Sequence, residues 1–163
     1  EPKRLQKITR KRNNKINDLF HKISRKIINY CVENNFGTII IGYNRAWKQK
    51  VNIGKINNQK FVQIPFFKLI NQIKYKSELF SIDIIIDGES FTSKCSFLDK
   101  EPIKKHKRYA GKRINRGLFK SKKGILINAD VNAGYNIIKK VVPNAVSADG
   151  IEGVGLHPYS IAI

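Results

Sequence analysis

Two stretches constrain the fold of this chain most, because each sets carboxylates among apolar residues. They are residues 83–98, DIIIDGESFTSKCSFL, and residues 125–138, ILINADVNAGYNII. In the first, a run of β-branched residues ended by a glycine predicts a buried strand, which leaves Glu89 at the strand's carboxyl end. Alternation along this strand sets Asp83 on the same face as Asp87, and the role of these two residues stays open.

The second stretch predicts a helix that Pro143 stops, with Asn128 as its N-cap and Asp130 in its first turn. Together with the strand it indicates an α/β fold. Mg²⁺ prefers oxygen ligands and is usually held by one or two carboxylates, while substrate phosphates and water complete its coordination. Glu89 and Asp130 meeting over a sheet edge would form half of such a site. In the alternative interpretation, Asp130 only stabilises the helix N-terminus through the macrodipole, and Glu89 is a solvated turn residue.

The composition points to a nucleic-acid partner. The 163 residues make a single domain or part of one, and a hydrophobic content of 41% argues against disorder. A net charge of +20 and a pI of about 10.1 predict a polyanionic partner. The sequence has no apolar run of about 18 residues and no signal peptide, which predicts a soluble, cytoplasmic protein without membrane contact. Cys31 and Cys95 are therefore not expected to form a disulfide.

Residues 4–35 carry apolar side chains at helical spacing and basic side chains on the opposite surface, which predicts one long helix ended by Gly37. A strand is expected at residues 38–43. The basic surface would line a phosphate backbone, although a solvated helix face is the alternative. The residues expected to contribute include Arg10, Arg12, Lys22 and Arg25.

A second helix is expected at residues 66–80, where the density of apolar residues is typical of a buried element. The residues expected in its core are Phe66, Phe67, Leu69, Ile70, Ile73 and Tyr75.

The loop at residues 44–50 holds Trp47 among basic residues that include Arg45 and Lys48. Aromatic and basic side chains interleaved in this way suit stacking on an unpaired base, although a lone Trp is equally often a core residue.

Residues 92–124 carry a basic segment in which Lys112, Arg113 and Arg116 would guide a nucleic-acid strand. The alternative is a poorly ordered, solvated loop. Residues 144–163 are rich in Gly, Ala and Pro and are expected to form a mobile tail.

Four blocks of this sequence resemble successive blocks of the OrfB/TnpB proteins of bacterial insertion sequences. They are RKRNNKINDLFHKISRKIINYCVENN, TIIIGYNRAWKQK, GESFTSKCS and RGLFKSKKGILINADVNAGYNIIKK. Those proteins are RuvC-like, RNA-guided DNA endonucleases, similar to the nuclease halves of type V CRISPR effectors. The resemblance implies an RNase H-like sheet with three acidic positions, Mg²⁺ as cofactor, and DNA and a guide RNA as partners. Asp130 lies in the block that matches the third acidic position.

The chain departs from the commoner family pattern at the second acidic position, which matches Gly42 or Tyr43. Some members carry instead an acidic residue just before the TSKCS block, and Glu89 fits that arrangement. The resemblance therefore implies that Glu89 and Asp130 are the catalytic Mg²⁺ ligands. The loss of an acid at the usual position is also compatible with an inactive protein.

The family's zinc ribbon is degenerate here. Cys95 matches one ligand, but the other three ligand positions fall on Leu98, Lys120 and Lys123, and His106 alone does not restore four ligands. The sequence therefore predicts no zinc, with a basic insert in the place of the ribbon.

The first acidic position and the first strands of the family precede the long helix, so the resemblance implies a C-terminal part with a partial RNase H-like (RuvC-like) fold. Its expected parts are a first nuclease segment at 1–91, the basic insert at 92–124, the C-terminal helix at 125–143 and the tail at 144–163. Little or no nuclease activity is expected of such a part alone. The alternatives are a catalytically inactive, nucleic-acid-binding remnant and, less in keeping with the blocks, a basic structural protein that binds structured RNA.

Overall fold

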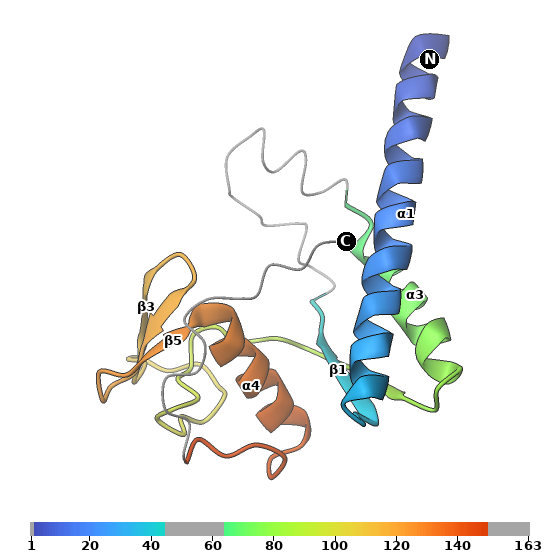
Figure 1. The fold of residues 1–163 in the computed structure, drawn as a ribbon. Helices are drawn as coiled ribbons and strands as arrows, with labels where there is room; N and C mark the ends of the chain where they lie inside the picture. The colour runs from blue at the N-terminus through green and yellow to red at the C-terminus, as the bar shows by residue number, and fades with distance from the viewer. Residues whose placement is uncertain (1, 45–63, 150–163) are drawn as a thin grey trace. The chain divides into compact units, whose positions relative to one another are not determined.

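The computed structural model describes residues 2–44 and 64–149, which divide between two compact units (Figure 1). The described part of the first unit is residues 2–39 and 64–84, and that of the second is residues 40–44 and 85–149. The expected base-stacking loop, with Arg45, Trp47 and Lys48, lies outside the described residues.

The long helix α1 spans Lys3–Glu33 and confirms the helix expected from the apolar periodicity. Its end differs from the prediction, because the helix stops before Gly37. Asn35 takes a positive φ of 56°, and the N–H of Phe36 reaches back to the C=O of Cys31 at 2.8 Å. Asn tolerates the left-handed conformation better than most residues, so the chain turns at Asn35 without needing a glycine.

Helix α3, Phe66–Glu78, packs against α1 within the first unit. On α1 the buried residues recur at helical spacing, and on α3 the buried apolar residues are Ile70 and Ile73. Phe67 and Tyr75, by contrast, are 58% and 46% exposed, so the prediction that they belong to the core is wrong. A helix that packs on one neighbour buries a single stripe, and these two aromatic residues lie outside it. The buried residues of α1 are Phe20, Ser24, Ile28 and Cys31.

Strands β1, Thr38–Gly42, and β2, Asp83–Asp87, form a two-stranded sheet. Asp83 N–H bonds to Gly37 C=O at 2.9 Å, and Tyr43 N–H bonds to Asp87 C=O at 2.8 Å. Residue numbers rise together along the two strands, so they run parallel, and the segment that joins them contains α3. The prediction that β2 is buried is wrong, since Ile86 is 47% exposed. A sheet with two strands among the described residues buries little of either face.

The second unit contains an antiparallel sheet in the order β3-β4-β5, followed by helix α4 (Figure 1). The elements are β3, Lys112–Asn115; β4, Leu118–Lys120; β5, Leu126–Asn128; and α4, Ala129–Val141. A two-residue turn joins β3 to β4, and Gly117 supplies its positive φ of 78°. The segment expected to be either a guiding insert or a solvated loop therefore includes two short strands.

The core of the second unit is apolar and lies between the sheet, α4 and the segment before β3. Val146 and Ala148 pack against this core, so the expected tail begins with residues that are in contact with the fold. The ring of Phe97 stacks on that of Tyr135 with centroids 4.7 Å apart. The buried members of the cluster are Phe97, Leu98, Phe119, Ile127 and Ala129.

Helix α4 begins as the sequence predicts. The Asn128 side chain accepts hydrogen bonds from the N–H groups of Asp130 and Val131, at 2.9 and 3.2 Å. Replacing Asn128 with Ala leaves these two donors unpaired, and we expect the free energy of unfolding to fall by about 1 kcal/mol. Chemical denaturation measures the change. Asn128→Asp keeps a capping oxygen and serves as the control; equal losses in the two variants would contradict the capping role.

Candidate metal and nucleic-acid site

Glu89 lies just after β2, where the strand ends, and its side chain is half-buried. Its backbone C=O accepts hydrogen bonds from the hydroxyl and the N–H of Thr92, at 2.7 and 3.3 Å, which fixes the turn that carries the carboxylate. Burial raises the pKa of Glu89, because the charged form loses hydration there. A nearby cation would stabilise the charged form of this half-buried carboxylate.

The position of Gly42 bears directly on Glu89. A Cβ built on Gly42 would lie 3.3 Å from the Cβ of Glu89 and 2.6 Å from the Cδ1 of Ile137 in α4. The side chain of Glu89 therefore starts beside the space that a side chain at residue 42 would enter, and Ile137 fills part of that space. Position 42 is one of the two expected, from the resemblance, to match the family's usual second acidic residue.

Asp130 is exposed in the first turn of α4, and it shares one face of that helix with Ile137. Seven residues separate the two, which is about two turns or 10 Å of helix. Glu89 lies near Ile137, and the adjacent Gly88 accepts a hydrogen bond from Lys140, so Glu89 lies beside the C-terminal half of α4. The two expected carboxylates thus belong to the same unit, with Asp130 in the first turn of α4 and Glu89 near Ile137, about two turns further along.

Asp87, whose role the sequence left open, has a partner. Its carboxylate lies 2.8 Å from the Nζ of Lys140, which also donates to the C=O of Gly88. The hydrogen bond from Lys140, followed by one from the backbone of Gly88, holds the pKa of Asp87 below its usual value. Asp87 is therefore engaged in an ion pair that ties the end of β2 to the last turn of α4. Asp83 is exposed at the start of the strand.

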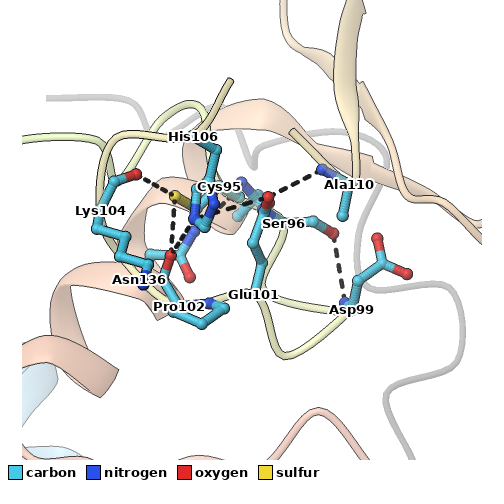
Figure 2. A network of polar contacts seen from close by, with 10 residues as sticks. Cys95, Ser96, Asp99, Glu101, Pro102, Lys104, His106, Ala110 and Asn136 are labelled. Carbon is cyan, nitrogen blue, oxygen red and sulfur yellow. Dashed lines mark hydrogen bonds and ion pairs between the residues drawn. The ribbon is translucent and has the colours of Figure 1, made fainter. Parts of the chain in front are cut away.

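The segment around Cys95, where the resemblance predicts a degenerate zinc ribbon, is held by hydrogen bonds within the protein (Figure 2). The thiol of Cys95 donates to the C=O groups of Pro102 and Lys104, at 3.5 and 3.6 Å, and burial raises its pKa. The buried carboxylate of Glu101 accepts from the N–H groups of Ser96 and Ala110, at 2.8 and 2.9 Å. Within residues 2–44 and 64–149, no three His, Cys, Asp or Glu side chains gather closely enough to hold a metal ion.

The expected nucleic-acid contacts fall in both units. Those on α1 belong to the first unit and those on the β3–β4 hairpin to the second, and all of them are exposed. They are Arg10, Arg12, Lys22 and Arg25 on α1, and Lys112, Arg113 and Arg116 on the hairpin.

Sequence reasoning missed the buried amine of Lys76 in α3. Lys76 is 4% exposed, and its Nζ donates to the C=O of His21 and to the hydroxyl of Ser24, at 2.7 and 2.6 Å. Only the spacing in the sequence could have indicated this burial, since Lys76 follows the buried Ile73 by three residues and so lies on the same helix face.

Two family models match different parts of the chain. The first, OrfB_IS605, described as "Probable transposase", matches residues 1–48. The second, the Cas12f1-like TNB domain, matches residues 66–137, which include both Glu89 and Asp130. The chain belongs to the OrfB/TnpB family.

The fold of this OrfB/TnpB-family chain is similar to that of a protein chain in a cryo-EM structure of the Cas12f1–sgRNA–target DNA complex. The TM-score is 0.64 at 23% sequence identity, over 83% of this chain. The matched region is 36% of the Cas12f1 chain, so this chain spans about a third of that protein's length. The likeness confirms a mixed α/β fold of this kind. No curated protein sequence matches the chain significantly.

No helix in the described part of the chain, residues 2–44 and 64–149, is both long and apolar enough to cross a membrane.

Proposed function

We propose that this chain forms part of a RuvC-like, Mg²⁺-dependent DNA endonuclease guided by RNA, in which Glu89 and Asp130 hold the metal. The observation that carries the proposal is the proximity of Glu89 to position 42. A carboxylate that starts 3.3 Å from the missing Cβ of Gly42 reaches the same region as an acid at residue 42 would. The glycine therefore makes room for an acid that arrives from the neighbouring strand of the sheet.

The parallel pair β1–β2, with a helix in the segment between them, supports a partial RNase H-like fold. Parallel strands place their carboxyl ends at one edge, which is where α/β proteins gather their ligands. Glu89 follows the carboxyl end of β2, and Gly42 ends β1.

The donor set fits Mg²⁺, because Glu89 and Asp130 supply hard oxygen ligands and substrate phosphates would supply others. The metal, when bound, activates water and stabilises the leaving oxygen. The turn that Thr92 closes fixes the backbone of Glu89. Asp130 lies in the first turn of α4. Since burial raises the pKa of Glu89, metal affinity should rise as pH increases through that pKa and the proton leaves.

The proposal includes no structural zinc. A zinc site needs four Cys or His ligands, and at one of the matching positions stands Leu98, whose side chain belongs to the apolar core. Cys95 and Glu101 are already used in hydrogen bonds that hold the loop.

An inactive, nucleic-acid-binding remnant is the second candidate. The observation that favours it is that the described residues bring together no group of three acidic or other metal-ligating side chains. In this case the basic residues of α1 and the β3–β4 hairpin would bind nucleic acid without cleavage.

Cleavage of target DNA by the full-length product of the gene, with its bound RNA, tests the proposal. We expect cleavage that requires Mg²⁺ and that Asp130→Asn lowers on the order of a hundredfold, because the neutral amide is a poor metal ligand. The exposed Asp83 provides a matched control, since Asp83→Asn removes the same charge from the same protein. Salt-dependent binding without any cleavage by the unaltered protein would establish the remnant instead.

A further inference from the structure

A groove between α1 and α3 gathers positive charge in the first unit. It has a volume of about 660 Å³ and is shallow and widely open to solvent. Lys22, Arg25 and Lys26 line it from successive turns of α1, at positions i, i+3 and i+4. Tyr75 and Lys76 line it from α3, and His21 and Asn29 of α1 complete the lining. We call these seven residues the α1–α3 groove.

The floor of the groove is a buried ammonium. Lys76 uses two of its three donors on His21 C=O and Ser24 Oγ, neither of which carries a negative charge. Burial, and then repulsion from Arg25, lower the pKa of Lys76. An anion bound in the groove would offset both effects, because it would supply the counter-charge that these two neighbours do not.

The rim of the groove suits phosphate. Arg25 is exposed and presents a planar fork of donors that matches two phosphate oxygens. Lys22 pairs with Asp18 at 3.0 Å, with both side chains more than half exposed, at 55% and 66%. Such a pair contributes little, so Lys22 can exchange Asp18 for a stronger anion.

An aromatic ring lies beside these cations. Tyr75 is 46% exposed, and its hydroxyl lies 3.4 Å from Nδ1 of His21. A half-exposed ring next to phosphate-binding cations can stack on a base or pack on a sugar of the same strand. This combination favours a nucleic-acid backbone over a free inorganic anion.

From these observations we propose that the α1–α3 groove is a phosphodiester-binding site that anchors one segment of a nucleic-acid strand. Arg25, Lys22 and Lys26 contact the phosphates, Tyr75 contacts the adjacent nucleoside, and Lys76 supports the site from below as a positioning residue. The inference deepens the proposed function and rests on it. The sequence predicted nucleic-acid contacts spread along the basic surface of α1, whereas this proposal places one contact at a defined site.

Binding of the full-length protein to labelled oligonucleotides tests the groove, in EDTA so that no cleavage occurs. We expect the double variant Arg25→Ala/Lys26→Ala to raise Kd about tenfold or more and to lower the slope of log K against log salt by about 1.4 to 1.8. The double variant Lys68→Ala/Lys74→Ala removes the same charge from exposed positions of α3 outside the groove and should change Kd less than about twofold. Circular dichroism verifies that both variants are folded.

Equal losses in the two double variants would overturn the proposal, because they would show a diffuse positive field. Parallel measurements with single-stranded RNA, single-stranded DNA and duplex DNA of one length identify the strand, which is the one whose binding the groove variant weakens most. Tyr75→Ala should weaken single strands more than Tyr75→Phe does, since only the first loses the ring. The assay is independent of Glu89 and Asp130, so a failed cleavage test and a failed groove test remain distinguishable.

Discussion

Replacing Glu89 with Gln is expected to lower Mg²⁺-dependent cleavage by the full-length protein on the order of a hundredfold or more. The amide has nearly the shape of the carboxylate, so the fold is retained while a charged metal ligand is lost. Single-turnover cleavage at saturating Mg²⁺ measures the effect, and nucleic-acid binding in EDTA should stay within about twofold. Cleavage unchanged by Glu89→Gln would contradict the role of Glu89 as a ligand.

The proximity of Gly42 to Glu89 offers a stricter test, in which the carboxylate is moved to the neighbouring strand. A side chain at residue 42 would meet Cδ1 of Ile137 at 2.6 Å, so Ile137 must be shortened first. We expect the triple variant Gly42→Glu/Ile137→Ala/Glu89→Gly to recover part of the cleavage that Glu89→Gln loses. The control Ile137→Ala/Glu89→Gly has the same space without the carboxylate and should stay inactive.

The helices could be predicted from the sequence because their signals are local. The periodicity of α1 and the Asn128 cap of α4 each lie within a few residues of the element they define. The short strands β3, β4 and β5 have three or four residues each and little apolar alternation, so the sequence showed only a basic segment there. The many apolar residues of α3 predicted a buried helix, but their number does not reveal how many faces of the helix pack against other elements.

The candidate site depends on contacts between distant residues. Resemblance to a family pointed to Glu89 and Asp130, but it could not show that Glu89 starts beside Gly42, which has no side chain. That proximity follows from the pairing of β1 with β2, whose residues lie more than forty positions apart in the chain. Lys76 was missed for a similar reason, because only packing against α1 makes its amine the floor of a groove.

Asn132 ties α4 to the loop that carries Cys95, and its loss is expected to have the largest effect on stability. It is fully buried, accepts from Phe97 N–H at 2.9 Å and donates to Cys95 C=O at 3.0 Å. Asn132→Ala leaves the Phe97 N–H buried without a partner and opens a cavity, so the free energy of unfolding should fall by about 3 kcal/mol. Denaturation by urea measures this change in the free energy of unfolding.

Gly134→Ala, in the same helix with open space around its new Cβ, should instead raise stability by about 0.5–1 kcal/mol.

Asn136 shares an acceptor with Asn132, which makes the two residues interdependent. Its Nδ2 donates to Cys95 C=O at 2.8 Å and to Thr92 C=O at 2.9 Å, while its Oδ1 is buried without a partner among the described residues. Asn136→Ala therefore removes one unpaired atom and should cost less than Asn132→Ala, about 1–2 kcal/mol. In either single variant Cys95 C=O keeps one donor, but in the double variant it keeps neither. The double variant should thus lose more than the sum of the two single losses, by about 1 kcal/mol, and simple additivity in the same urea series would show that the shared carbonyl does not couple them.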